Sequence, residues 1–291
     1  MVKKYRGAET DDFSRVQFSL VNYEYYKNLV KIVFDDEKQE KEFLDNVKDN
    51  KYNDLKTYFD GIVFGKWLTE TEKLFYVNSL YYVIQKNNYL NKLLSLAYTK
   101  ISNRKIKVYL SFGSAGKSGL KGYFSYSLSK SNELVIQFNH LKRTDKILSK
   151  SKRANLKETD KIKHRLINSG IGVIYHEIGH YLDFSVINYS LPPSKQTLSY
   201  PSREEYKEEI RRWTMLFFSK KQAKRKADYY SSESEVFARM FEIYNNYEIF
   251  DNKFAFSQDY MPALMYEILY VLPQRLGIYD YLKNNFFEKY K

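Results

Sequence analysis

The sequence predicts an α+β fold that is mostly helical, with a small antiparallel or mixed sheet and a helical N-terminal region. Three observations support this. Apolar residues recur at helical spacing from residue 15 to about 100, the alternation typical of strands begins at 105, and helical spacing returns from about 170 to the C-terminal tail. With 291 residues, we expect a helical N-terminal region of unknown role, 1–100, and a second domain, 101–291.

The clearest helix signals of the N-terminal region lie between 69 and 100. Thr69 and Glu72 form a capping-box pattern in front of the stretch KLFYVNSLYYVIQ. The stretch YLNKLLSLAY then continues with apolar residues at helical spacing. We therefore expect consecutive helices here and no strand before residue 105.

Strand character follows in three stretches. KIKVYLSF alternates between polar and apolar residues, and a Gly/Ser-rich stretch follows it. GYFSYS and NELVIQF then read as two strands joined by the polar turn LSKS. These three strands are the predicted sheet.

Helical patterns fill the rest of the chain. The first of these helices carries the stretch GIGVIYHEIGHYLD, and a polar connector with three prolines follows it. We expect a helix from about Ser202 to Lys226, then helices near 232–247 and 262–272, the last one ended by Pro273. The C-terminal tail is therefore predicted to be helical.

Composition excludes several classes of site. The chain has no cysteine, which removes disulfides, cysteine-ligated zinc and thiol catalysis. The N-terminal stretch MVKKYRGAETDDFSRVQFSL lacks the continuous apolar segment of a secretory signal. No segment approaches the roughly 20 apolar residues that span a bilayer, and the mean hydropathy is −0.60. We expect a cytoplasmic protein with no membrane partner.

The net charge of +13 is concentrated in two stretches. Residues 142–165 carry ten basic and three acidic side chains, and KKQAKRK at 220–226 is a second basic cluster. Each is either a solvated surface or a surface for nucleic acid or an acidic polypeptide. Neither stretch has the interleaved aromatic residues that stack on bases.

The pattern H-E-x-x-H, formed by His176, Glu177 and His180, is the strongest chemical signal in the sequence. In a helix the two histidines stand one turn apart on one face, so that both imidazoles can bind a single Zn²⁺. Glu177 is rotated off that axis and is suited to be the general base acting on a water at the metal. Asp183 could orient one of the imidazoles through its second nitrogen, or it could form a helix-end hydrogen bond.

A third zinc ligand is expected to be a carboxylate, because the chain has only two other histidines. The predicted helix 231–244 offers Glu233, Glu235 and Glu242. Glu235 borders the apolar stripe of this helix, so its carboxylate can point towards a neighbouring helix. Ser232 and Glu235 also match a capping box, which leaves open whether Glu235 is a ligand or a cap.

Three stretches together resemble the zincin-type metallopeptidase domain of large polyvalent proteins of phages and conjugative elements: FGSAGKSGLKGYFSYSLSKSNELVIQFNHLKR, GIGVIYHEIGHYLD and YYSSESEVFARMFEIY. They are more distantly similar to the catalytic domain of anthrax lethal factor and related gluzincins. The resemblance covers about residues 105–247 and implies a zincin-like fold. It implies zinc ligation by His176, His180 and Glu235, and Asp183 falls on the family's x-x-D position.

The resemblance also implies an activity, that of a zinc-dependent endopeptidase of phage or mobile-element origin. The family places a tyrosine shortly before the glutamate helix to stabilise the oxyanion, and Tyr229 and Tyr230 are both candidates, of which Tyr229 aligns better. An extended polypeptide substrate is expected along strand 132–138, taken as a sheet edge. Residues 142–165 exceed the family's short linker and are expected to be a basic insertion that acts as a lid or binds a partner.

Two other functions remain open at this point. One is a zincin-fold structural or virion protein with weak or no turnover. The other is a DNA-associated, antirestriction-like protein that uses the basic surface and keeps the zincin as a scaffold. An intact Glu177 favours the enzyme, because a metal scaffold needs no general base. A phage-encoded enzyme would act in the host cytoplasm or be packaged in a virion.

Overall fold

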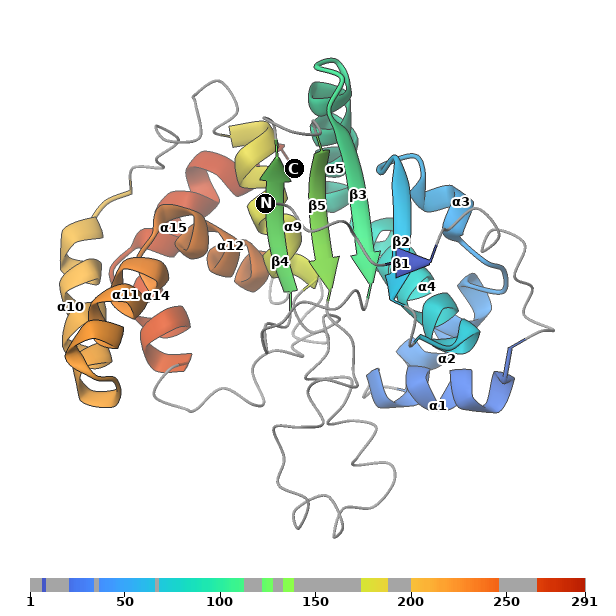
Figure 1. Ribbon diagram of the computed structural model, residues 1–291, viewed down its shortest axis with the longest axis horizontal. Coiled ribbons are helices and arrows are strands. Elements are labelled where there is room, and N and C mark those ends of the chain that lie inside the picture. Colours follow the sequence, from blue (N-terminus) through green and yellow to red (C-terminus); the bar gives the residue numbers. More distant parts are fainter. Residues whose placement is uncertain are drawn as a thin grey trace, which may run out of the picture.

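The computed structural model describes most of the chain, as a sheet with helices on either side of it (Figure 1). The described residues are 7–8, 21–33, 37–65, 68–112, 122–127, 133–138, 174–187, 200–245 and 266–290. The predicted basic insertion 142–165 and the Gly/Ser-rich stretch after residue 112 lie outside them. Among the described residues the fold is α+β and mostly helical, as the sequence predicts.

The sheet has five strands in the order β1-β2-β3-β5-β4. Their bounds are β1 Gly7–Ala8, β2 Gly61–Gly65, β3 Lys107–Phe112, β4 Gly122–Ser127 and β5 Glu133–Phe138. The pairs β2–β3 and β3–β5 are parallel, so of the two predicted alternatives, an antiparallel or a mixed sheet, the antiparallel one is wrong. Antiparallel pairing is confined to β1–β2 and to the predicted strand pair β4–β5.

The predicted substrate strand 132–138 is not a sheet edge. β5 pairs with β3 on one side and with β4 on the other, so its main-chain groups already form ladders in both directions. The prediction was wrong because β4 does not pair with β3, its predecessor in the chain. Instead β4 lies outside β5 and forms the edge of the described sheet.

The N-terminal region is less purely helical than predicted. Its helices are α1 Tyr23–Val33, α2 Glu37–Asn46, α3 Tyr52–Leu55, α4 Glu70–Lys86 and α5 Asn88–Ser102. The capping box before α4 is confirmed, with Glu72 N donating to Thr69 Oγ1 at 3.2 Å and Thr69 N donating to Glu72 Oε2 at 2.8 Å. The prediction that no strand precedes residue 105 is wrong, because the short apolar run of β2 is buried between β1 and β3.

The C-terminal part is helical, with two departures from the prediction. Its elements are α9 Ile174–Leu182, η4 Asp183–Ile187, α10 Arg203–Phe217, α11 Lys220–Tyr230, α12 Glu233–Ile243, η8 Glu267–Val271, α14 Leu272–Arg275, α15 Ile278–Leu282, η9 Lys283–Phe287 and η10 Glu288–Tyr290. The helix predicted over 202–226 is broken at Phe218, whose backbone is extended. Pro273 does not end a helix; it lies in the first turn of α14, where its missing N–H leaves no intrahelical hydrogen bond unmade.

A single hydrophobic core joins the described parts of the chain. Its members run from Tyr26 in α1 to Phe287 in η9, and the largest fully buried side chains are all tyrosines and phenylalanines. A buried hydrogen bond of 2.6 Å from Asn87 Nδ2 to Asn245 Oδ1 links the start of α5 to the end of α12. The N-terminal hundred residues therefore share both sheet and core with the C-terminal helices. Among the described helices, none has the length and apolarity to cross a bilayer.

Candidate metal centre

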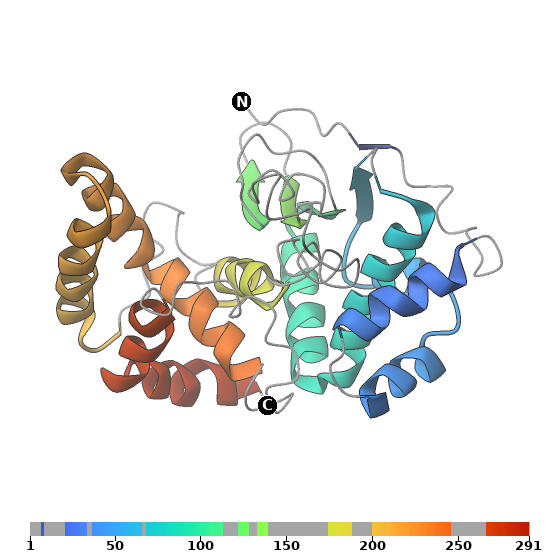
Figure 2. The ribbon, with the colours of Figure 1, turned by 90° about the horizontal axis from the view of Figure 1, so that it is seen from below.

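The helix α9 presents the two histidines of the H-E-x-x-H pattern together. The rings of His176 and His180 lie 4.8 Å apart between centroids and are nearly perpendicular, at 89°. Their Nε2 atoms are 3.2 Å apart. The helix packs against β4, β5 and α12, and nearly all its other side chains are buried (Figures 1 and 2). The histidine face is thereby held inside the molecule, between the sheet and α12.

The helix α12 brings the third donor, Glu235, to the same place. Its Oε1 lies 3.3 Å from His180 Nε2 and its Oε2 lies 3.5 Å from His176 Nε2. Donor atoms of all three residues lie within 4.8 Å of one another. Two donors at about 2.0–2.1 Å from a tetrahedral zinc ion are themselves about 3.3–3.4 Å apart. The spacing of these donors therefore fits a Zn²⁺ ion.

A glycine allows the two helices to come this close. A Cβ added to Gly179 would lie 3.0 Å from Ala238 Cα and 3.4 Å from Ala238 Cβ, so any larger residue would press on the backbone of α12. Glycine in a helix interior costs up to about 1 kcal/mol relative to alanine, which the close packing offsets here. Gly179 and Ala238 thus set the distance across which Glu235 reaches the histidines.

The contacts around Glu235 are not those of a capping residue. Ser232 is the N-cap residue of α12, but its side chain makes no capping hydrogen bond and instead donates to the carbonyl of Tyr229 at 2.9 Å. The Glu235 carboxylate faces both histidines and also accepts from Arg239 Nη1 at 3.4 Å. The buried Arg239 also donates to the carbonyl of Tyr230, and this hydrogen bond links α12 to the end of α11.

The second ring nitrogens of both histidines face polar groups. His180 Nδ1 lies 2.8 Å from Ser234 Oγ, and His176 Nδ1 lies 3.7 Å from Glu242 Oε2. Glu242 in turn accepts a hydrogen bond of 2.9 Å from Tyr270 Oη. The Glu242 carboxylate favours a proton on His176 Nδ1, which leaves the Nε2 lone pair of that ring for a metal, and Ser234 Oγ can accept from His180 Nδ1 in the same way.

Asp183 was expected either to orient an imidazole or to end the helix. It is buried at the first position of η4, the π-helical turn that continues α9. The contacts to the Nδ1 atoms described above come from Ser234 and Glu242, two residues of α12. Both roles expected of Asp183 therefore stay predictions.

The charges of the site are strongly coupled. Burial acts to lower the pKa of His176, but the carboxylates of Glu235 and Glu242 outweigh it and raise that pKa to about 10. Burial dominates at His180 and lowers its pKa. Although burial opposes ionisation of Glu235, both histidines hold its pKa well below the ordinary value. Glu235 is thus the anion of the cluster, and a dication can replace the proton that it shares with the histidines.

Glu177 lies beside the cluster without belonging to the donor set. Its side chain is buried, and its Oε2 has no hydrogen-bond partner among the described residues. Burial raises its pKa to about 8, and the negative charges of Glu235 and Glu242 add to this effect against the opposing influence of His176. A buried carboxylate oxygen without a partner is costly, and functional sites are where proteins retain such groups.

The structure distinguishes the two candidate tyrosines. Burial raises the pKa of Tyr229, and the nearby carboxylate of Glu235 adds to this effect. Tyr230 packs elsewhere, beside Ile210 and Trp213 of α10, with Lys226 over its ring. Of the pair, Tyr229 is the residue whose hydroxyl interacts with Glu235.

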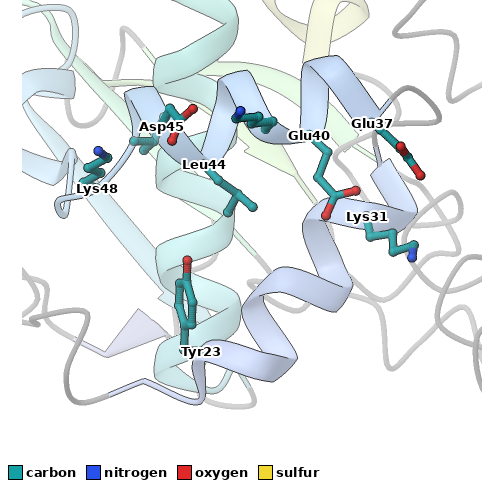
Figure 3. A pocket seen from close by; sticks show the side chains of 9 residues that line it. Tyr23, Lys31, Glu37, Glu40, Leu44, Asp45 and Lys48 are labelled. Carbon is teal, nitrogen blue, oxygen red and sulfur yellow. The ribbon is translucent and has the colours of Figure 1, made fainter.

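A surface pocket between α1 and α2 is unrelated to this cluster (Figure 3). It contains equal numbers of basic and acidic side chains, so its charge favours neither anions nor cations. The lining residues are Tyr23, Lys31, Glu37, Glu40, Lys41, Leu44, Asp45, Val47 and Lys48. None of the predicted site residues lies in it.

Comparison with models of known protein families, with curated proteins and with solved structures finds no match for this chain. The resemblance to the zincin-type metallopeptidases therefore stays a prediction. The arguments for a function that follow depend on the geometry of the described residues.

Proposed function

We propose that the chain is a zinc-dependent endopeptidase of gluzincin type. The observation that carries the proposal is the cluster of His176, His180 and Glu235, with the partnerless Oε2 of Glu177 beside it. Two imidazoles and one carboxylate are a ligand set of catalytic zinc sites, which keep a further position open. A purely structural zinc site is closed by a fourth protein ligand, and no fourth donor joins the cluster among the described residues.

Bound zinc would polarise the scissile carbonyl and lower the pKa of a water molecule at the site. Glu177 takes the proton from that water and passes it to the leaving amine. Its burial suits this role, because a carboxylate that binds protons more tightly than usual is a better base. Ser234 and Glu242 hold the two imidazoles in the tautomer that binds metal.

Tyr229 donates to the oxyanion that develops on the substrate carbonyl. Because its pKa is raised, the phenol stays protonated and remains a hydrogen-bond donor throughout the neutral range. The residue is 49% exposed, so it is open to a substrate that arrives from solvent. Tyr230 has no part in the reaction.

The edge strand β4 is the proposed docking strand for an extended polypeptide. It replaces β5, which is paired on both sides. β4 forms the edge of the described sheet and packs against α9, so a peptide added to it would run past the metal helix. Phage or mobile-element origin, and a place in the host cytoplasm or in a virion, rest on the sequence resemblance alone.

The activity is tested by incubating the zinc-loaded full chain with a diverse peptide library and reading new termini by mass spectrometry. We expect cleavage that a chelator abolishes and added zinc restores. A chain that binds one zinc and cleaves nothing in the library would instead be the structural or virion protein that the sequence left open. Tight binding to duplex DNA without cleavage would favour the antirestriction-like alternative.

A further inference from the structure

Three consecutive apolar side chains are exposed at the end of α10. Met215 is 63% exposed, Leu216 is 72% exposed and Phe217 is 52% exposed. Within the described part of the chain, the other large exposed apolar side chains are Tyr23 and Tyr229. A helix of a globular protein ordinarily places its apolar residues towards the core, and a contiguous apolar patch marks a contact surface.

Basic residues surround this apolar tip. The chain turns at Phe218 and enters α11, where Lys220, Lys221 and Lys224 are exposed while Ala223 faces inward. Arg225 adds another exposed cation, and no acidic residue occurs between positions 213 and 227. We call Met215–Phe217 together with these four cations the hairpin tip.

The hairpin tip lies at one end of the molecule. α10 and α11 pack against each other and stand apart from the sheet, on the side opposite the N-terminal helices (Figures 1 and 2). The inner side of α10 is occupied, because Ile210 and Trp213 pack near Tyr230 and Ile268. Phe217 borders this inner side and is half exposed, whereas Met215 and Leu216 are the more exposed residues of the tip.

We infer that the hairpin tip docks on the surface of an anionic lipid bilayer. Apolar side chains flanked by lysines and arginines are the composition of segments that insert shallowly among lipid headgroups, with the cations meeting anionic lipids. A nucleic acid would use the cations but not Met215, Leu216 and Phe217. A protein partner is disfavoured because lysine is depleted in protein–protein interfaces.

This inference departs from the sequence-based expectation of no membrane partner. That expectation was drawn from hydropathy, which tests for a spanning segment and not for a surface contact. The inference also gives the basic cluster 220–226 an anionic lipid as partner, where the sequence left open a solvated surface or a surface for nucleic acid or an acidic polypeptide.

Vesicle flotation with the full chain tests the inference. We expect binding to phosphatidylcholine vesicles that contain phosphatidylserine, and none to phosphatidylcholine alone. Met215→Ser/Leu216→Ser/Phe217→Ser should lower the partition coefficient about tenfold or more. Lys220→Gln/Lys221→Gln/Lys224→Gln should lower it about fivefold for each lysine removed. Circular dichroism and zinc content check that each variant is folded.

A matched variant separates local docking from net charge. Lys41→Gln/Lys48→Gln/Lys107→Gln removes three exposed lysines elsewhere and should leave vesicle binding within about twofold of the parent. Equal losses in both lysine variants would overturn the inference, as would absence of binding to anionic vesicles or full binding by the serine variant. Binding to duplex DNA or polyglutamate but not to vesicles would assign the tip to that partner and overturn it as well. None of these readouts depends on peptidase activity.

Discussion

Glu235 is the residue on which the metal site depends most. Glu235→Gln removes the anionic oxygen that lies 3.3 Å from His180 Nε2, so we expect zinc affinity to fall at least about 100-fold. Competition with a chelator measures the loss. Glu233→Gln is the matched control, because Glu233 on the same helical turn pairs with Arg203 and should keep parental affinity. If both variants bind zinc equally well, Glu235 is not a ligand.

Glu242 lies beside His176, one of the proposed metal ligands. Its carboxylate lies 3.7 Å from His176 Nδ1 and accepts from Tyr270 Oη, so Glu242→Gln should weaken the hold on the imidazole and lower zinc affinity about 10- to 100-fold. Tyr270→Phe, which removes only the donor to Glu242, should have the same effect to a smaller degree. The same chelator competition measures both. A loss of thermal stability with unchanged zinc affinity would instead show that Glu242 only supports the core.

The sequence predicted some of these residues and not others, for a physical reason. His176 and His180 are neighbours on a single helix, so their spacing alone indicates that both can bind the same metal ion. Glu235 could be ranked above Glu233 and Glu242 but not distinguished from a cap. The contacts of Ser234, Glu242 and Arg239 depend on the angle and distance between α9 and α12, which no local pattern encodes. Of these residues, Glu242 has one signal in the sequence, its position. It follows Glu235 by seven residues, or two helical turns, and so lies on the same face of the helix.

Among the secondary-structure elements, the contact between α9 and α12 is the one that assembles the site. Gly179→Ala adds a methyl group that would lie 3.0 Å from Ala238 Cα, so α12 must move away. We expect a net loss of about 1–3 kcal/mol in the free energy of unfolding, despite the better helix propensity of alanine. Zinc affinity should fall as well, because Glu235 moves with α12. Denaturant unfolding and chelator competition check the two effects, and a more stable variant with parental zinc affinity would contradict the role given to Gly179.

Local sequence patterns predicted several helices and strands correctly, but they did not predict how the strands pair in the sheet. The capping box at Thr69 and Glu72 marks the start of α4, because both hydrogen bonds lie within one turn. β2 was missed because three apolar residues between two glycines carry no period that distinguishes a strand from a helix. β5 was wrongly predicted to be an edge strand. The order of strands along the chain does not decide their order in the sheet, where β5 lies between β3 and β4. That order depends on pairing between strands that are far apart in the chain, and it moves the proposed substrate strand to β4.

At the scale of the whole molecule, the N-terminal hundred residues belong to the same folding unit as the metal site. β2 pairs with β3, α5 packs against β3 and α9, and Asn87 bonds Asn245 at the end of α12. A fragment of residues 101–291 would expose the apolar surfaces that these contacts cover. We expect it to be unfolded by circular dichroism and to bind zinc no better than an unfolded chain. A folded fragment with parental zinc affinity would instead show two independent domains.

The central claim, that this chain is a zinc peptidase with Glu177 as its base, is tested most directly by Glu177→Gln. The glutamine has nearly the same shape and Glu177 is not among the three donors, so the variant should retain one zinc per chain by native mass spectrometry. Hydrolysis of a peptide that the parent cleaves should fall at least about 100-fold, because the proton acceptor is lost. Retained zinc together with unchanged turnover would contradict the account.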